Sequence, residues 1–168
     1  MKAIAREKGL TNFEPAASNL AHYARRSQGP KKQKSTSTSA ILIVDVDTSN
    51  LASLTKVIEK EGFTVLVSSD GREARKILKG QPDIVAAIFK PVIPHISGPD
   101  LVRFMRREEH LRNIPVMMMT QAESIRISCE GLAAGAVVLL PEPFSPGQVQ
   151  NLLHMLVDSS HAANQQKI

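Results

Sequence analysis

From residue 40 onward the sequence predicts an α/β fold, in which a doubly wound, five-stranded parallel sheet carries helices on both faces. Short apolar runs rich in β-branched residues recur five times in about 120 residues, and continuous runs of this kind are typical of strands buried on both faces. Segments with apolar residues at helical spacing separate these runs. The regular alternation of strand and helix indicates parallel pairing through right-handed crossovers.

The five apolar runs are the predicted strands. Each is followed directly by a polar residue or a Pro, and their lengths of five to eight residues suit buried strands. In chain order they are residues 40–47, 63–67, 83–89, 114–120 and 136–140.

Capping residues mark the helices between the strands. In the first helix Ser49 can act as the cap, apolar residues follow at helical spacing, and Gly62 ends the helix. Two later helices have a Pro near the start, where its missing N–H is tolerated. The remaining helices are predicted at 70–80, after Ser97, at 123–134, and after Ser145 up to about residue 158.

The doubly wound rule favours the strand order 2-1-3-4-5, the flavodoxin-like arrangement. In such sheets the functional site lies beyond the carboxyl ends of the strands, at the switch point between the first and third strands. Five polar side chains stand at or just after these strand ends and are the candidate site residues: Asp45, Asp47, Lys90, Thr120 and Glu142.

Positive charge is concentrated ahead of this domain. Residues 1–39 hold eight Lys/Arg and two Glu, whereas the rest of the chain holds 13 basic and 14 acidic residues. We therefore expect a largely flexible basic tail and linker at 1–39, a domain at 40–158 and a polar C-terminal tail at 159–168. Residues 25–34 can contact nucleic acid or an acidic surface, although a solvated linker is the commoner role of such a segment.

Composition argues against several classes of protein. No window reaches the roughly 18–20 apolar residues of a membrane span. The N-terminus lacks the apolar core of a signal peptide, so we expect a cytoplasmic protein. The single Cys129 excludes an intramolecular disulfide framework, and the five His are scattered without the spacing of zinc ligands.

Five motifs in the predicted domain, taken in order, resemble the receiver domain of two-component response regulators. ILIVDVD (41–47) is similar to that family's acidic first strand, and DGREA (70–74) to the start of its second helix. PHISG (94–98) is similar to the turn after its third strand, IPVMMMT (114–120) to its fourth strand, and GAVVLLPEPFSP (135–146) to its Gly-Ala and Lys-Pro-Phe region. The resemblance implies a role in phosphorelay signalling with a protein partner, such as a histidine kinase or an output protein, rather than catalysis.

In the family that these motifs resemble, an acidic pair on the first strand and an Asp ending the third bind Mg²⁺, and that Asp accepts phosphate. Lys90 falls in the acceptor position here, counted back from the proline of PHISG, with Ile88 as the competing assignment. Residues 84–97 contain no Asp or Glu in any register. The acyl phosphate of a receiver needs a carboxylate nucleophile, so we expect a degenerate, pseudo-receiver form.

The other functional positions depart from the family as well. Val46 replaces the second acid, Glu142 replaces the lysine of the fifth strand, and Thr120 alone keeps its phosphate-binding type. We therefore expect no cofactor, with Mg²⁺ binding lost or weak. Because the acid and the base have exchanged places, we predict an ion cluster in which the Lys90 ammonium is paired with Glu142 and Asp45.

Simpler interpretations remain for four of the candidate site residues. Lys90 can be an exposed loop residue, and Asp47 a turn or cap acid, which is the reading we favour. Thr120 can be only a β-branched strand residue. Asp45 ends an apolar strand, where a structural partner is commoner than a metal.

The predicted function is that of a binding module that docks onto a protein partner. The resemblance places the docking surface on the fourth helix, fifth strand and fifth helix. One alternative is a working phosphorelay receiver modified at Asp45 or Asp47, and another is a regulator tethered to nucleic acid by its tail. The docking candidates are Arg126, Ser128, Leu139, Gln148 and Gln150.

Overall fold

A computed structural model describes residues 38–165 of the 168-residue chain. The basic tail predicted at 1–39 lies outside the described residues except for its last two. The nucleic-acid contact predicted at 25–34 lies entirely outside them.

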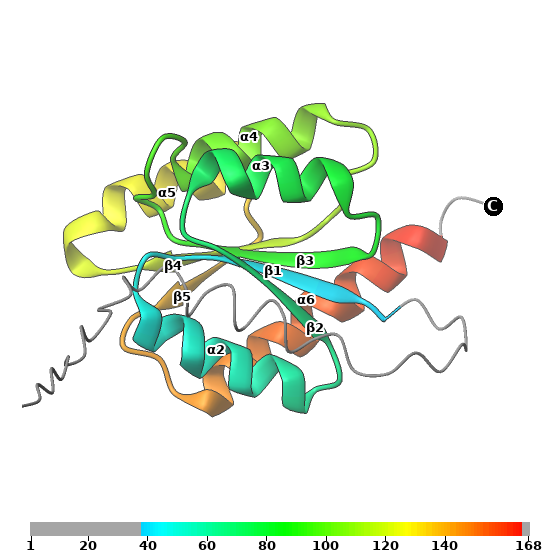
Figure 1. The fold of residues 1–168 in the computed structure, drawn as a ribbon, viewed down its shortest axis with the longest axis horizontal. Coiled ribbons are helices and arrows are strands. Elements are labelled where there is room, and N and C mark those ends of the chain that lie inside the picture. The colour runs from blue at the N-terminus through cyan, green and yellow to red at the C-terminus, as the bar shows by residue number, and fades with distance from the viewer. Residues whose placement is uncertain (1–37, 166–168) are drawn as a thin grey trace, which may run out of the picture. The chain divides into compact units, whose positions relative to one another are not determined.

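Five strands form one sheet in the order β2-β1-β3-β4-β5 (Figure 1). All neighbouring strands pair in parallel, which confirms the predicted fold class and strand order. The first strand is shorter than its apolar run, because ladder pairing ends before the acidic residues that follow. The strands are β1 (Ala40–Val44), β2 (Thr64–Ser68), β3 (Ile84–Phe89), β4 (Val116–Thr120) and β5 (Val138–Pro141).

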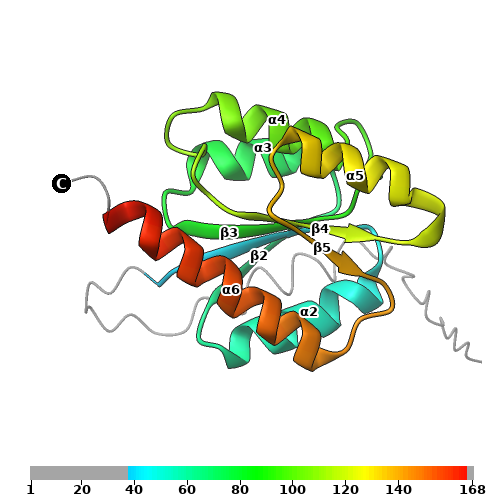
Figure 2. The ribbon, with the colours of Figure 1, turned by 180° about the vertical axis from the view of Figure 1, so that it is seen from behind.

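Helices cover both faces of the sheet, as Figures 1 and 2 show from opposite sides. Two helices lie on one face, namely α2 (Thr48–Lys60) and α6 (Pro146–Gln165). Three lie on the other face, namely α3 (Gly71–Gly80), α4 (Gly98–Arg107) and α5 (Ile125–Ala134), the last preceded by a short 3₁₀ turn, η1 (Ala122–Ser124).

The two faces of the sheet enclose two separate hydrophobic cores. Leu42 and Phe89 point toward the face of α3, α4 and α5, whereas Ile41 and Ile88 point toward the face of α2 and α6. All four side chains are fully buried. The strands therefore need apolar residues at every position, which explains why they appear in the sequence as continuous runs.

A bulge interrupts the pairing of β1 with β3 at its start. Ala40 lies opposite Ile84 and Ile41 opposite Ala86, so Val85 has no partner in the register. A β-bulge places two residues of one strand against one of the other. The extra residue lengthens the stretch that leads to the end of β3, and it determines which side chains of β3 reach the edge of the sheet.

The first helix begins earlier than its sequence signals predicted. Asp47, not Ser49, is the N-cap of α2: its carboxylate accepts hydrogen bonds from the backbone N–H of Ser49 (2.8 Å) and of Asn50 (3.3 Å). Asp and Ser are comparable as caps, and Asp47 comes first after the strand. The interpretation of Asp47 as a cap acid is confirmed.

The last helix continues beyond the boundary predicted at residue 158. Helix α6 packs its Leu153 and Leu156 into the core and then extends to Gln165. Once the packed turns have formed, each further residue adds a hydrogen bond at little cost, and the Ala-containing segment 159–165 has no strong helix breaker.

No helix in residues 38–165 is both long and apolar enough to cross a membrane.

Candidate functional site

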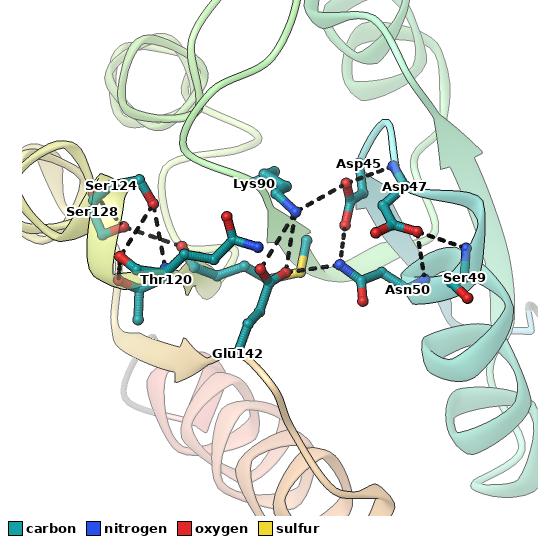
Figure 3. Close-up of polar contacts among 11 residues, drawn as sticks. Asp45, Asp47, Ser49, Asn50, Lys90, Thr120, Ser124, Ser128 and Glu142 are labelled. Atoms are coloured by element: carbon teal, nitrogen blue, oxygen red, sulfur yellow. Dashed lines mark hydrogen bonds and ion pairs between the residues drawn. The ribbon is translucent and has the colours of Figure 1, made fainter.

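Three charged residues meet at the carboxyl edge of the sheet, although they are far apart in the sequence. Asp45 follows β1, Lys90 follows β3 and Glu142 follows β5. In Figure 3 the Lys90 ammonium lies between the two carboxylates. The parallel arrangement produces this meeting, because the carboxyl ends of all strands lie at the same edge.

The distances show a paired cluster of charges. The Nζ atom of Lys90 lies 3.3 Å from Oε1 and 3.4 Å from Oε2 of Glu142, and 3.6 Å from Oδ1 of Asp45. The exposed fractions of the side chains are 14% for Lys90, 7% for Glu142 and 0% for Asp45. The predicted meeting of these three side chains is confirmed, and the simpler interpretation of Lys90 as an exposed loop residue is wrong.

Asn50 completes the cluster, and the sequence interpretation missed it. Its side-chain amide donates to Oδ2 of Asp45 (3.0 Å) and to Oε1 of Glu142 (2.8 Å), so one NH₂ group bridges two carboxylates. We call Asp45, Asn50, Lys90 and Glu142 the Lys90 cluster. The only signal in the sequence was an Asn in the first turn of the helix that follows the acidic strand end.

Both carboxylate oxygens of Asp45 have partners within the protein. Oδ1 accepts from the backbone N–H of Asp47 (2.9 Å) and faces Lys90, and Oδ2 accepts from Asn50. No buried side-chain nitrogen or oxygen among the described residues lacks a hydrogen-bond partner. Burying an unpaired charge would cost several kcal/mol, and this arrangement avoids that penalty.

The structure also decides between Lys90 and Ile88 at the end of β3. Ile88 pairs with Ile43, is fully buried and packs in the core beneath α2 and α6. Lys90 is the first residue beyond the strand, and its backbone N–H donates to Val44 O (2.9 Å). The side chain at the edge of the sheet is therefore that of Lys90.

Two of the candidate side chains do not join the cluster. The carboxylate of Asp47 is engaged as the cap of α2, and only its backbone N–H reaches Asp45. The hydroxyl of Thr120 makes one long hydrogen bond, of 3.5 Å, to Gln121 O, and among the described residues it makes no hydrogen bond to the Lys90 cluster (Figure 3). Only the backbone oxygen of Thr120 reaches the cluster, where it accepts from the backbone N–H of Glu142 (2.8 Å). Val46, in the position of the second acid, is 52% exposed.

The docking candidates are in unequal positions. Arg126 is exposed, and Leu139 is half-buried. Gln148 and Gln150 are exposed but already bonded, to Ser145 and Glu61 respectively.

Ser128 is not available to a partner, so its assignment to the docking surface was wrong. It is fully buried, and its hydroxyl bonds Met119 O (3.2 Å) and Ser124 O (3.1 Å). The reason is the rotation of α5, which turns Ser128 toward the sheet. Ile125 and Leu132 lie at the edge of this inward face and stay partly exposed, with exposed fractions of 49% and 38%.

A family model described as the response regulator receiver domain matches residues 41–154. Among curated relatives, the transcriptional regulatory protein CpxR of Escherichia coli is 30% identical over 127 residues, which is 76% of this chain and 53% of CpxR. The two-component response regulator-like APRR5 of Arabidopsis thaliana is 30% identical over 113 residues, which is 67% of this chain and 20% of APRR5. The chain thus spans about half or less of the length of these relatives.

Solved structures are similar over most of the described residues. A putative response regulator from Chloroflexus aurantiacus has 28% identity and a TM-score of 0.65, covering 72% of this chain and 98% of its own. The chemotaxis response regulator CheY4 of Vibrio cholerae has 25% identity and the same TM-score of 0.65, covering 71% and 98%.

Proposed function

This chain belongs to the response regulator receiver domain family, and from that premise we propose that it is a receiver that takes no phosphoryl group and signals by docking onto a protein partner. The observation that carries the proposal is the Lys90 cluster. An ammonium, held 3.3 Å from Glu142 and 3.6 Å from Asp45, stands at the end of β3. A receiver that accepts phosphate needs a carboxylate nucleophile and a separate cation for the product at this edge.

No carboxylate at this edge is suited to attack a phosphoryl donor. Asp45 is fully buried, and both of its oxygens are engaged. Asp47 is exposed, but its carboxylate caps α2. The one cation of the cluster, Lys90, is paired with Asp45 and Glu142 instead. Glu142 is occupied by Lys90 and Asn50. These arrangements favour a permanent structural role for the acids over the alternative of phosphorylation at Asp45 or Asp47.

The residues also do not suit Mg²⁺, which prefers about six oxygen ligands in octahedral geometry. In the described residues no group of three or more His, Cys, Asp or Glu side chains is placed to hold a metal. The Lys90 ammonium lies between the two carboxylates that remain, and Val46 supplies no oxygen from its side chain. We therefore infer that the positive charge of Lys90 takes the place of Mg²⁺ between the carboxylates, so that the protein docks onto its partner without a bound metal.

The partner would contact the apolar surface of α5 and the start of β5. Ile125, Leu132 and Val137 are 49%, 38% and 50% exposed, and Leu139 on β5 is half-buried. Apolar side chains exposed in one region mark protein-binding surfaces. Because the site at the sheet edge is permanently filled, binding here would be governed by the concentration of the partner, a signalling protein such as a histidine kinase or an output protein, and not by phosphorylation.

The first test is to treat the purified chain with Mg²⁺ and either acetyl phosphate or beryllofluoride. Intact mass reports phosphoryl transfer, and amide chemical shifts report both reagents. We expect no mass gain and no shifts. A gain of one phosphoryl group, or shifts clustered around Asp45 and Lys90, would overturn the proposal.

A reconstructed variant serves as the positive control. The triple substitution Val46→Asp, Lys90→Asp and Glu142→Lys restores the acidic pair, the acceptor and the lysine of the family pattern. Val46 is exposed, so an acid there needs no buried space. Labelling of this variant shows that the reagents and the fold are competent. Lys90→Asp alone should stay unlabelled, because the other two positions remain unsuited to the metal and to the phosphoryl group.

A further inference from the structure

Positive charge is strongly segregated within the folded domain, away from the Lys90 cluster. Helices α3 and α4 together hold seven Lys/Arg and two Asp/Glu. The rest of residues 40–168 holds six Lys/Arg and twelve Asp/Glu. The excess of cations on two neighbouring helices is thus opposite in sign to the charge of the remaining domain.

The cations form a single surface. On α3 they recur at i, i+3, i+4 and i+7, the spacing of one helix face. Helix α4 lies beside α3 on the same side of the sheet (Figures 1 and 2) and adds two more. All six side chains are exposed. We call this surface the basic face, and its residues are Arg72, Arg75, Lys76, Lys79, Arg103 and Arg107.

An aromatic ring joins the two helices within the basic face. The Arg75 guanidinium lies 4.7 Å, and the Lys79 ammonium 5.6 Å, from the centroid of the Phe104 ring. Such cation–π contacts hold the cations over the ring without neutralising them. The two helices therefore present a preformed array of charge.

Few of these charges are compensated within the protein. The two helices hold two acids, Glu73 and Asp100. Asp100 pairs with Arg103 at 2.7 Å, whereas the carboxylate of Glu73 accepts a hydrogen bond from the Ser68 hydroxyl and makes no ion pair with a described residue. Within residues 38–165 the other five cations of the basic face have no ion pair. A concentration of unpaired cations on one face is unfavourable by self-repulsion, and an anionic partner would relieve it.

From this face we propose that the protein binds the phosphate backbone of nucleic acid through α3 and α4, independently of sequence. Arg72 and Lys79 are seven positions apart and span about 10 Å of helix. Duplex DNA carries one charge per roughly 1.7 Å of its axis, so the same length presents about six phosphates. Four cations of α3 lie along this length and two of α4 lie beside them, so the cations are comparable in number with the phosphates. Phosphate contacts also need no apolar surface.

Other anionic partners suit the face less well. A membrane-binding helix inserts large apolar side chains below the headgroups, and a protein interface has an apolar core. The large exposed apolar residues of the described chain all lie outside α3 and α4, and Phe104 is half-buried under cations. Only a partner bound mainly by charge fits this surface.

The test measures binding of the full chain to a fluorescent duplex of about 20 base pairs by anisotropy, as a function of salt. A triple variant removes three cations whose side chains make no hydrogen bond, ion pair or cation–π contact within residues 38–165: Arg72→Gln, Lys76→Gln and Arg107→Gln. If each cation contacts one phosphate, the negative slope of the logarithm of the association constant against log salt becomes shallower by about 2–3. The affinity near 0.1 M salt falls at least about tenfold.

A matched control removes the same number of charges elsewhere. Its substitutions, Lys56→Gln, Lys60→Gln and Arg126→Gln, are on the exposed faces of α2 and α5. Both variants retain residues 1–39 and have equal net charge, so any contribution of that segment is the same in the two. We expect the control to bind nearly as the unmodified chain does, and thermal melts to show that both variants are folded.

The proposal would be overturned by an equal loss of duplex binding in the two variants, or by no duplex binding of the unmodified chain even at low salt. It would also be overturned if the basic face bound vesicles of phosphatidylserine and phosphatidylcholine but not the duplex. Each of these results is independent of the phosphorylation test, because the basic face and the Lys90 cluster share no residue.

Discussion

Replacing Asp45 with Asn is the most direct test of whether the Lys90 cluster stabilises the fold. The substitution keeps the size of the side chain and removes one negative charge from a fully buried position. One carboxylate oxygen becomes an NH₂ group. Because Asp47 N–H and Asn50 Nδ2 donate to different oxygens of Asp45, the new NH₂ must face one of these donors in either orientation.

The expected loss follows from the contacts that remain. A hydrogen bond to a charged group contributes about 1.5–3 kcal/mol, and one such bond is replaced by a repulsive contact between donors. Removing one partner of a fully buried ion pair costs about 3–5 kcal/mol. Lys90 keeps Glu142 at 3.3 Å and is 14% exposed, so only part of that penalty applies. We expect Asp45→Asn to lower the free energy of unfolding by about 2–4 kcal/mol.

Urea denaturation at neutral pH measures this loss, and Asp47→Asn is its matched control. The control makes the same chemical change two residues later, at an exposed N-cap where Asn and Asp are equally good. It should stay within about 0.5 kcal/mol of the unmodified chain. Equal stability of the two variants would refute the cluster as a stabilising unit. If Asp45→Asn were more stable than the unmodified chain, Glu142 alone would be enough to neutralise Lys90, and the charge of Asp45 would be unfavourable.

Three further substitutions test other contacts of the fold. Arg106→Ala removes five hydrogen bonds to backbone carbonyls and should cost about 2–4 kcal/mol in urea denaturation, whereas exposed Arg107→Ala should change little. Gly135→Ala should cost more than about 1 kcal/mol in thermal melts, because φ is +117° and a Cβ would lie 2.9 Å from Arg106 Nε. The hydrogen bond from His154 lowers the pKa of Glu61, so this pair adds stability above the ordinary pKa of a carboxyl and loses it as the pH falls through the lowered value. Glu61→Gln should therefore flatten the acid side of the stability–pH profile, and an unchanged profile would contradict the pairing.

The fold class, the strand order and the meeting of Lys90 with Asp45 and Glu142 could all be predicted from the order of residues along the chain. Strands buried on both faces are continuous apolar runs, so they are visible in local sequence. A parallel doubly wound sheet brings its carboxyl strand ends to one edge, so residues at those ends can be placed together without knowledge of side-chain packing.

The contacts that the side chains make around this edge could not be predicted in the same way, because they depend on how the helices pack against the sheet. The bridge made by Asn50, the burial of Ser128 and the carbonyl contacts of Arg106 depend on the rotation of each helix about its axis. The bulge at Val85 depends on the pairing of β3 with β1. These features are set by contacts between residues far apart in the chain, whereas propensity and periodicity describe only neighbours in sequence.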